Sequence, residues 1–297
     1  MGHFFFRDSG KSMTSLINNA FSNLMPVNRP GFLIIGAQKA GTTALFHYLS
    51  GHPNLAGSTK KEVNFFSCDS LYSKGISFYH SYFPKKTSRA ITTFDSSPSY
   101  LHNSNAHHRI FTYNRGIKMI IMLRDPIQRA FSAWNMYKGR YLNNRDWFFE
   151  DWVSYCNLDT VFTKRNDDAL FDFNKFVREE VEHCEQGSDD LIECPILSHG
   201  LYHQQISRYF SLFEREQFLI IESMDLRNKP RDVLRKIESF LGIEHADWEE
   251  HHFKPVFEGT YTDLLDKESS ALLAEYYRDD TENLFDLLHT RFQWATS

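Results

Sequence analysis

A buried strand that runs into a glycine-rich loop and then into a helix constrains this fold more than any other feature. Residues 32–35 (FLII) form an apolar run of strand length directly before Gly36, as expected for a strand buried on both faces of a parallel sheet. The loop that follows, GAQKAGTT over residues 36–43, opens a helix at residues 44–49. Such a loop presents backbone N–H groups and the positive end of a helix, which together suit a phosphate or a sulfate.

The alternation of strands and helices continues along the chain. Further apolar runs predict strands at Ala90–Phe94, Met119–Leu123 and Phe218–Ile221. Helical patterns lie between or after them, at Ile127–Tyr137, His203–Phe213, Arg231–Leu241 and Glu268–Leu288. This order predicts an α/β protein with a P-loop-like three-layer fold, in which a central parallel sheet is flanked by helices.

The 297 residues are predicted to form one main domain, from residue 31 to residue 297. Residues 1–30 are interpreted as an N-terminal extension, because prolines and a glycine close this stretch before the first strand. No apolar run reaches the roughly 20 residues that span a bilayer, and the first residues lack a clean signal-peptide pattern. We therefore expect a cytoplasmic location, or a soluble form of an otherwise anchored protein.

The balance of charge argues against nucleic acid as a partner. The chain holds 33 Lys and Arg residues against 38 Asp and Glu residues, which gives a net charge of −5. Nucleic-acid-binding domains are usually basic. A local basic pocket for a phosphorylated ligand stays compatible with this value, since the net charge averages over the whole surface.

Cysteines and histidines give no sign of a metal site. The four cysteines contain no C-x-x-C pair, and the histidines show no H-E-x-x-H spacing. We therefore expect no metal. Cys184 and Cys194 flank an acidic stretch and either bridge across a turn or stay free, and free thiols are the expectation in a reducing compartment.

The glycine-rich loop differs from the phosphate loop of nucleotide triphosphatases, which reads G-x-x-x-x-G-K-[ST]. Gly36 and Gly41 keep that spacing, but Thr42 stands at the lysine position and the lysine of this loop is Lys39. Asp95, after the second predicted strand, is the nearest candidate for a magnesium-binding partner. A magnesium-dependent kinase is therefore disfavoured, although it stays open together with a purely structural turn.

A second feature that suits an anion follows the strand at Met119–Leu123. Arg124 comes directly after this strand, at the carboxyl end, where α/β folds bind ligands. Its planar guanidinium suits a phosphate bidentately. Ser132 lies eight residues further on, about two helical turns, and can approach the same anion. The alternative is a surface arginine in a turn between strand and helix.

The first of these segments resembles the donor-binding loop of the sulfotransferases that use PAPS (3′-phosphoadenosine 5′-phosphosulfate). The stretch FLIIGAQKAGTTALFHYLSGHPNL is similar to the 5′-phosphosulfate loop of that family. The similarity lies closest to the branch that acts on heparan sulfate and related glycans, with its bacterial relatives. It implies that the donor contacts Lys39, Ala40, Gly41, Thr42 and Thr43.

The second segment, RDPIQRAFS, resembles the 3′-phosphate motif of the same family. The resemblance places Arg124 and Ser132 on the 3′-phosphate and Arg129 on the interior arginine of the motif. The Gly/Lys/Arg-rich C-terminal phosphate loop of the heparan enzymes is not recognisable in this chain. Lys254, in the segment HFKP, is assigned to its role.

The resemblance also supplies a candidate base. The segment KEVNFF is similar to the K-E-x-x-F-F segment of the glycan sulfotransferases, and YSKGISFY continues the match. We therefore expect Glu62 to take the proton of the acceptor and Lys39 to stabilise the leaving phosphate. Many cytosolic small-molecule sulfotransferases use a histidine base elsewhere, so Glu62 favours the glycan branch.

One departure from the family concerns the acceptor side. The segment from Asp95 to Leu101 resembles the E-K-[ST]-P-x-Y-[FL] pattern of the family, but Ser96 replaces its lysine. This change removes a cation and predicts a different acceptor geometry. Four aromatic residues either line the acceptor cleft or pack in the core: Phe65, Phe66, Tyr100 and Tyr202.

The resemblance implies an enzyme that moves a sulfuryl group from PAPS to a hydroxyl or amine of a carbohydrate or glycolipid-like acceptor, by in-line displacement. One alternative is a sulfotransferase for a small phenol or alcohol. Another is a nucleotide-binding, kinase-like protein with a P-loop. A third is an adaptor that binds the nucleotide without turnover, which the serine at position 96 supports.

Overall fold

The computed structural model of this chain describes residues 29–84, 91–144, 171–184, 196–249, 253 and 264–294. Within these residues, five parallel strands form one sheet in the order β2-β3-β1-β4-β5. The strands are β1 (Pro30–Gly36), β2 (Leu55–Gly57), β3 (Thr92–Ser96), β4 (Lys118–Leu123) and β5 (Phe218–Glu222).

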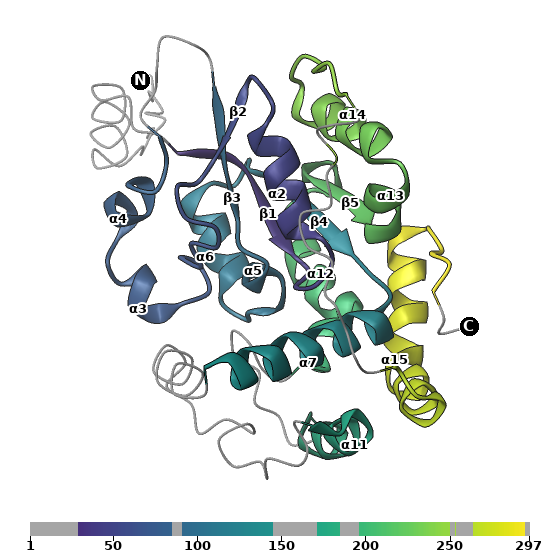
Figure 1. The fold of residues 1–297 in the computed structure, drawn as a ribbon. Coiled ribbons are helices and arrows are strands. Elements are labelled where there is room, and N and C mark those ends of the chain that lie inside the picture. Colours follow the sequence, from purple (N-terminus) through teal and green to yellow (C-terminus); the bar gives the residue numbers. More distant parts are fainter. Residues whose placement is uncertain are drawn as a thin grey trace, which may run out of the picture.

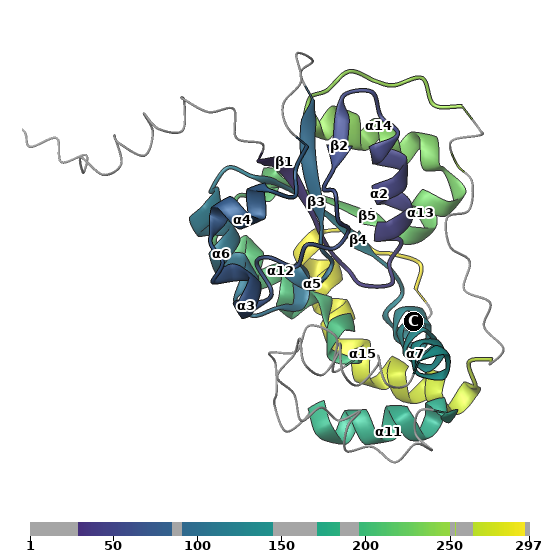
Figure 2. The ribbon, with the colours of Figure 1, turned by 60° about the vertical axis from the view of Figure 1, so that its left-hand side comes forward.

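Helices cover both faces of this sheet, which confirms the expected three-layer α/β fold (Figure 1 and Figure 2). One face carries α2 (Thr42–Ser50), α13 (Ser223–Asn228) and α14 (Pro230–Leu241). The other carries α5 (Ser99–His102), α6 (Ala106–Tyr113) and α12 (Tyr202–Phe210), with α3 (Asp69–Tyr72) and α4 (Ile76–His80) beside them. Two short 3-10 turns precede and follow α12, η1 (Ser198–Gly200) and η2 (Arg215–Gln217).

A second group of helices lies beyond the carboxyl ends of the strands (Figure 1). It consists of α7 (Pro126–Asn143), α11 (Phe173–Cys184) and α15 (Lys267–Leu288). Apolar side chains of α7, α11 and the first half of α15 pack a second core, whose members include Trp134, Phe176 and Tyr277. The second half of α15, with Leu284 and Leu288, packs into the core around the sheet. Because α7 begins soon after β4, this helix joins the second group to the sheet.

The two central strands bring the two predicted anion-binding segments to one edge of the sheet. β1 and β4 are parallel neighbours, with Ile34 opposite Ile120, and both side chains are fully buried. Parallel strands end on the same side of a sheet. The loop after Gly36 and the arginine after β4, Arg124, therefore emerge next to each other, at the edge where such folds bind ligands.

Three of the four predicted strands fall inside β1, β4 and β5. The strand predicted at Ala90–Phe94 forms two residues later, as β3, and residue 90 lies outside the described residues. β2 was not predicted, because its three residues are too short for a periodic pattern. The start of the main domain at residue 31 stays a prediction, since residues 1–28 are not described.

The predicted helices form, with shifts at their ends. α7 continues past the predicted end at Tyr137 to Asn143, and α12 ends at Phe210, before the predicted end at residue 213. Among the helices of the described ranges, none combines the length and the apolar character that a membrane crossing requires. The pairing of Cys184 with Cys194 stays untested, because Cys194 lies outside those ranges.

Candidate functional site

The loop between β1 and α2 adopts a conformation that suits an anion. Lys39 has a φ of 67° and Gly41 a φ of 92°, so the chain enters the left-handed region twice within a few residues. Gly41 precedes α2 and has no side chain that could cap it, and no side-chain capping hydrogen bond is made. The amides of the first helical turn, which includes Thr42 and Thr43, need partners from elsewhere. Together with the positive helix end, they suit a phosphate or a sulfate.

Two hydrogen bonds anchor this loop to the end of β4, and a third holds Arg124 to α12. The amide of Ala37 donates to the carbonyl of Met122 at 2.6 Å. The guanidinium of Arg124 donates to the carbonyl of Lys39 at 3.2 Å. The hydroxyl of Tyr202 donates in turn to the carbonyl of Arg124 at 3.0 Å. The structure therefore joins the two segments that the sequence assigned to one ligand.

Lys39 lies in a cluster of cations. Burial lowers the pKa of Lys39 from its ordinary 10.5 to about 8, and the nearby charges of Arg140, Arg124 and Arg129 lower this pKa as well. The carboxylate of Glu62 acts in the opposite direction. Three arginines and one lysine thus share a region with one carboxylate, an excess of positive charge that favours a ligand with several negative charges.

Glu62, the predicted base, is partly exposed. Its carboxylate accepts a hydrogen bond from Lys61 Nζ at 2.9 Å, and its side chain is 40% exposed. Its charge acts on the pKa of Lys39, so the two predicted catalytic residues lie within electrostatic range of each other, and their catalytic roles stay predictions. A carboxylate that is open to solvent and close to the cations can reach an acceptor group bound from outside.

The start of α7 supports the arginine of the second motif. The side chain of Asp125 caps this helix by accepting hydrogen bonds from the amides of Ile127, at 2.8 Å, and Gln128, at 3.2 Å. The helix then begins with proline, whose fixed φ suits a first helical position. Ser132 lies in the same helix and is buried. Arg124 is therefore followed directly by a capped helix.

Arg129, the interior arginine of the motif, is fully buried. One of its guanidinium nitrogens donates to the carbonyl of Ile196, and its charge acts on the buried hydroxyls of Tyr202 and Tyr277. This arginine therefore sits between the two cores. Its position suits support of the site from within more than direct contact with a ligand.

Sequence reasoning missed Arg140, which also lies on α7. Arg129 and Arg140 are eleven residues apart, close to three helical turns, so both lie on one side of the helix. On the same helix the hydroxyl of Tyr137 accepts a hydrogen bond from Gln38 Nε2 at 2.9 Å, which ties the loop to α7. The helical period of basic residues along α7 is the signal that could have revealed Arg140.

Asp95, the nearest candidate for a magnesium partner, accepts hydrogen bonds from three neighbouring hydroxyls. It is fully buried and accepts hydrogen bonds from the hydroxyls of Tyr79, Tyr100 and Ser97. Ser96 beside it is also fully buried, and its Oγ has no hydrogen-bond partner. Within the described part of the chain, no group of three or more His, Cys, Asp or Glu residues could hold a metal ion.

The four aromatic residues and Lys254 remain among the residues that the sequence singled out. The aromatic residues weighed for the acceptor cleft all lie in the core, with exposed fractions of 1% or less: Phe65, Phe66, Tyr100 and Tyr202. Core packing is therefore the role the structure gives them. Lys254 lies outside the described residues, so its assignment stays a prediction.

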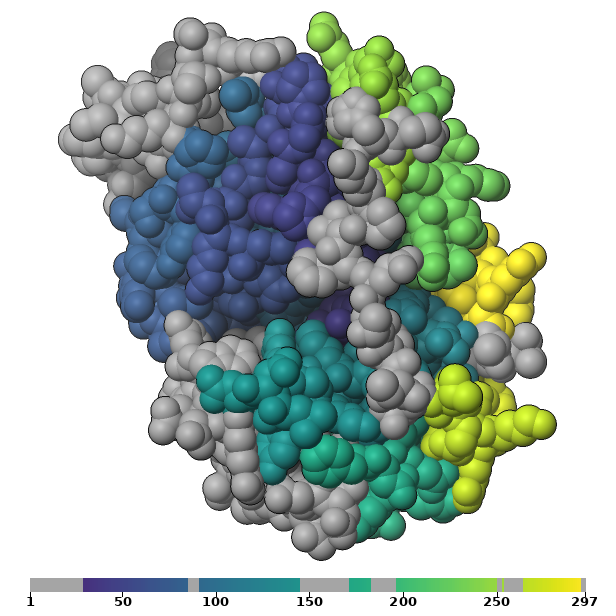
Figure 3. Space-filling model, viewed as in Figure 1, coloured from purple at the N-terminus to yellow at the C-terminus, as the bar shows by residue number. Residues whose placement is uncertain are grey.

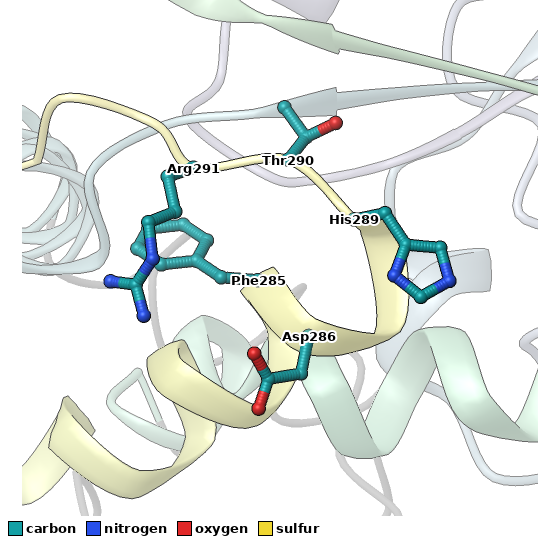
Figure 4. A pocket seen from close by; sticks show the side chains of 5 residues that line it. All are labelled: Phe285, Asp286, His289, Thr290 and Arg291. Carbon is teal, nitrogen blue, oxygen red and sulfur yellow. The ribbon is translucent and has the colours of Figure 1, made fainter.

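Two surface pockets lie apart from this cluster. One, of about 420 Å³, is formed at the end of α15 by Phe285, Asp286, His289, Thr290 and Arg291 (Figure 4). Arg291, which follows α15, forms an ion pair with Glu282 of that helix. The other, of about 450 Å³, is lined by Tyr48, Phe253 and residues 227–232. Neither includes a residue of the cluster around Lys39.

In the space-filling view, the purple-to-blue surface of residues 29–84 meets the teal surface of α7 (Figure 3).

Comparisons with known proteins agree on one family. A family model described as "Sulfotransferase domain" matches residues 29–267. The chain is 28% identical over 317 aligned positions to the membrane-associated sulfotransferase kil1 of Dictyostelium discoideum, covering 89% of this chain and 66% of that protein. It is 30% identical over 288 positions to the bifunctional heparan sulfate N-deacetylase/N-sulfotransferase 4 of Mus musculus, covering 88% of this chain and 30% of that protein.

A further curated relative is the heparan sulfate glucosamine 3-O-sulfotransferase 5 of Mus musculus, 29% identical over 216 positions, with 72% of this chain and 54% of that protein covered. The chain thus spans less than two thirds of the length of these curated relatives. Among solved structures, a sulfotransferase from Alicyclobacillus acidocaldarius superposes with a TM-score of 0.63 at 26% identity, and the match covers 90% of this chain and 98% of that one. The sulfotransferase domain of the curacin biosynthetic pathway, with a TM-score of 0.50 at 15% identity, shares the fold.

Proposed function

This chain belongs to the sulfotransferase domain family, and from that premise we propose that it transfers a sulfuryl group from PAPS to a hydroxyl or amine of a carbohydrate acceptor. The observation that carries the proposal is the contact between the two donor motifs. Arg124 donates to the carbonyl of Lys39 at the carboxyl edge of the sheet, and Glu62 lies within the same electrostatic cluster. The residues that we assign to the donor and to the base thus lie in one region, which supports the proposal.

The residues at this edge fit a donor with phosphates at both ends of its nucleoside. Lys39, Gly41, Thr42 and Thr43 surround the start of α2, where uncapped amides and the positive helix end suit the 5′-phosphosulfate. The 3′-phosphate, which ATP lacks, would contact Arg124. When bound, PAPS supplies the activated sulfuryl group. The excess of cations over carboxylates in the cluster supports a ligand of this charge.

Two side chains would carry the chemistry. The Glu62 carboxylate takes the proton of the acceptor hydroxyl or amine, which makes the acceptor a better nucleophile. Lys39 donates to the oxygens on which negative charge grows, and its position in the loop fixes that donor before reaction. With a pKa of about 8, Lys39 is mostly protonated at neutral pH and can act as a cation.

The acceptor class rests on two further points. Curated relatives are named for heparan sulfate, a carbohydrate. The candidate base is a glutamate, as in the glycan-type segment that the sequence resembles, and this glutamate is partly exposed. An extended acceptor can approach such a base from solvent. A serine at position 96, in place of the lysine of that branch, favours an acceptor that differs in detail from those of the heparan enzymes.

Transfer of label from ³⁵S-PAPS to a panel of desulfated glycans, glycolipids and simple phenols tests this proposal. We expect label in at least one carbohydrate, and a loss of about a hundredfold or more in Glu62→Gln, as for the loss of a general base. Glu216→Gln, an exposed glutamate in η2, is the matched control and should keep the parent rate. Label in phenols alone would contradict the carbohydrate acceptor, and a parent-like rate in Glu62→Gln would contradict the base.

A further inference from the structure

Asp95 is a buried acid that the proposed chemistry does not use. It lies near the carboxyl end of β3 and is fully buried. Its Oδ2 accepts hydrogen bonds from the hydroxyls of Tyr100, at 2.6 Å, and Tyr79, at 3.0 Å, and its Oδ1 accepts one from Ser97, at 2.8 Å. Burying a carboxylate is costly unless its lone pairs are satisfied, and this one has three donors.

Two of these hydroxyls continue toward the candidate base. The amide of Asn64 donates to Ser97 Oγ at 3.0 Å, and the amide of Phe65 donates to the hydroxyl of Tyr100 at 3.1 Å. Each hydroxyl has a single proton, which it gives to Asp95, so its oxygen is free to accept from the backbone. Two chains of hydrogen bonds, called relays below, therefore run from a backbone amide through a hydroxyl to the carboxylate of Asp95. In such a chain each hydrogen bond strengthens the next.

The backbone that these relays hold is unusual. Asn64 has a φ of 55°, in the left-handed region, which is uncommon for any residue other than glycine. The side chain of Asn64 is held as well, because its Oδ1 accepts from Ser99 Oγ at 2.7 Å. The turn leads from the partly exposed Glu62 to the buried rings of Phe65 and Phe66. The orientation of the backbone at Glu62 relative to the buried Phe65 and Phe66 therefore depends on this turn.

The charges of Asp95 and Glu62 also interact. Burial raises the pKa of Asp95, the hydrogen bonds from Tyr100, Ser97 and Tyr79 lower it, and the Glu62 carboxylate raises it again. The buried acid therefore lies close enough to the candidate base for the two charges to influence each other.

We infer that Asp95 is a positioning residue for the candidate base. Through Ser97 and Tyr100 it fixes the two amides that follow Glu62 and Val63, and thereby the place of the Glu62 carboxylate. The role of Glu62 in this inference rests on the proposed function, whereas the hydrogen-bond network stands without it.

Hydrogen exchange of the full-length protein tests the network without any acceptor. Asp95→Asn keeps the size and shape of the side chain but offers one acceptor oxygen in place of two. The hydroxyl of Ser97 or of Tyr100 therefore loses its acceptor. We expect the amide of Asn64, of Phe65 or of both to exchange about tenfold faster or more, as when one net hydrogen bond is lost. Tyr100→Phe should release the amide of Phe65 in the same way. Tyr79→Phe is the matched control, because Tyr79 bonds to Asp95 but is not part of either relay.

Rates test the consequence for the base. With PAPS and a desulfated heparan chain as probes, Asp95→Asn and Tyr100→Phe should lower kcat about tenfold or more, with the Kd for PAP, the desulfated product, within about twofold. In a Glu62→Gln background, Asp95→Asn should lower kcat no further, because it acts through Glu62. A purely structural role would instead give additive losses.

The outcomes separate the two proposals. Unchanged exchange in both Asp95→Asn and Tyr100→Phe would overturn the inference, whatever the rates. Faster exchange with a parent-like kcat, while Glu62→Gln is inactive, would overturn it as well and would leave the proposed function intact. A parent-like rate in Glu62→Gln would overturn the role of Glu62 and the inference with it. If Asp95→Asn does not fold, Tyr100→Phe decides by the same measurements.

Discussion

Lys39 shows how the surroundings of one residue set its chemistry. A lysine in water keeps its charge up to about pH 10. Here burial and three arginines bring the pKa of Lys39 down to about 8, while Glu62 opposes them. The arginines that we propose to attract an anionic donor thus also favour the uncharged form of Lys39.

This shift predicts a pH dependence of donor binding. A lysine with a lowered pKa loses its proton as the pH rises through about 8, so affinity for PAP should be full below that pH and fall above it. Between pH 7 and pH 9, we expect the Kd for PAP to rise about tenfold, as measured by calorimetry. Lys39→Arg, which stays charged, should flatten this profile. A Kd independent of pH in the parent would show that Lys39 does not bind the donor.

Gly41 is required for a different physical reason. Its φ of 92° is unfavourable for residues with a side chain, whereas an added Cβ would meet its nearest atom, on Leu226, only at an ordinary 3.9 Å. We therefore predict that Gly41→Ala lowers the free energy of unfolding by about 1–2 kcal/mol through the backbone alone. The control is Gly139→Ala in α7, where an added Cβ meets no atom within 4 Å. That change should be neutral or stabilising in a denaturant titration, and equal losses in both variants would contradict the argument.

At the scale of elements, α7, which carries the second predicted donor motif, is joined to α11. Glu180 of α11 is fully buried, and its two oxygens accept hydrogen bonds from the amides of Ile196 and Leu197, each at 2.8 Å. Arg129 of α7 donates to the carbonyl of Ile196. The segment before η1 therefore joins α7 to α11.

Removing the hydrogen bonds of Glu180 to this segment should lower the stability of the fold. In Glu180→Ala two buried amides lose their acceptors, and we expect the free energy of unfolding to fall by about 2–4 kcal/mol. Glu182→Ala, an exposed position on the same helix, should stay within about 0.5 kcal/mol of the parent. Denaturant unfolding measures both, and a loss of less than about 1 kcal/mol in Glu180→Ala would argue against this role of α11.

Across the whole molecule, the parts that could be predicted are those encoded locally. β1 and β4 are uninterrupted apolar runs, and the residues that follow them, Lys39 and Arg124, belong to local motifs. Because parallel strands end at one edge, their proximity followed from the fold class alone. The sequence could therefore predict the sheet and the meeting of the two candidate donor segments at its edge.

What could not be predicted depends on contacts between distant segments. β2 is too short to show a period, and Arg140 joins the site only through the packing of α7 against the loop. The bonds from Asn64 and Phe65 to Ser97 and Tyr100 cross more than thirty residues of sequence. No local pattern records such a network, because it depends on side-chain geometry in the folded core.

The central claim is that the edge formed by the loop after β1 and the arginine after β4 binds a donor with a 3′-phosphate. The most direct test is thermal stabilisation of the parent and of Arg124→Ala by PAP and by ATP with magnesium. A ligand at 100 times its Kd stabilises the folded state by about 2.7 kcal/mol. We predict that PAP raises the Tm of the parent by roughly 5 °C or more, that ATP with magnesium has a smaller effect, and that the gain from PAP is lost in Arg124→Ala. An equal or larger shift with ATP and magnesium, or no shift with PAP, would contradict the account.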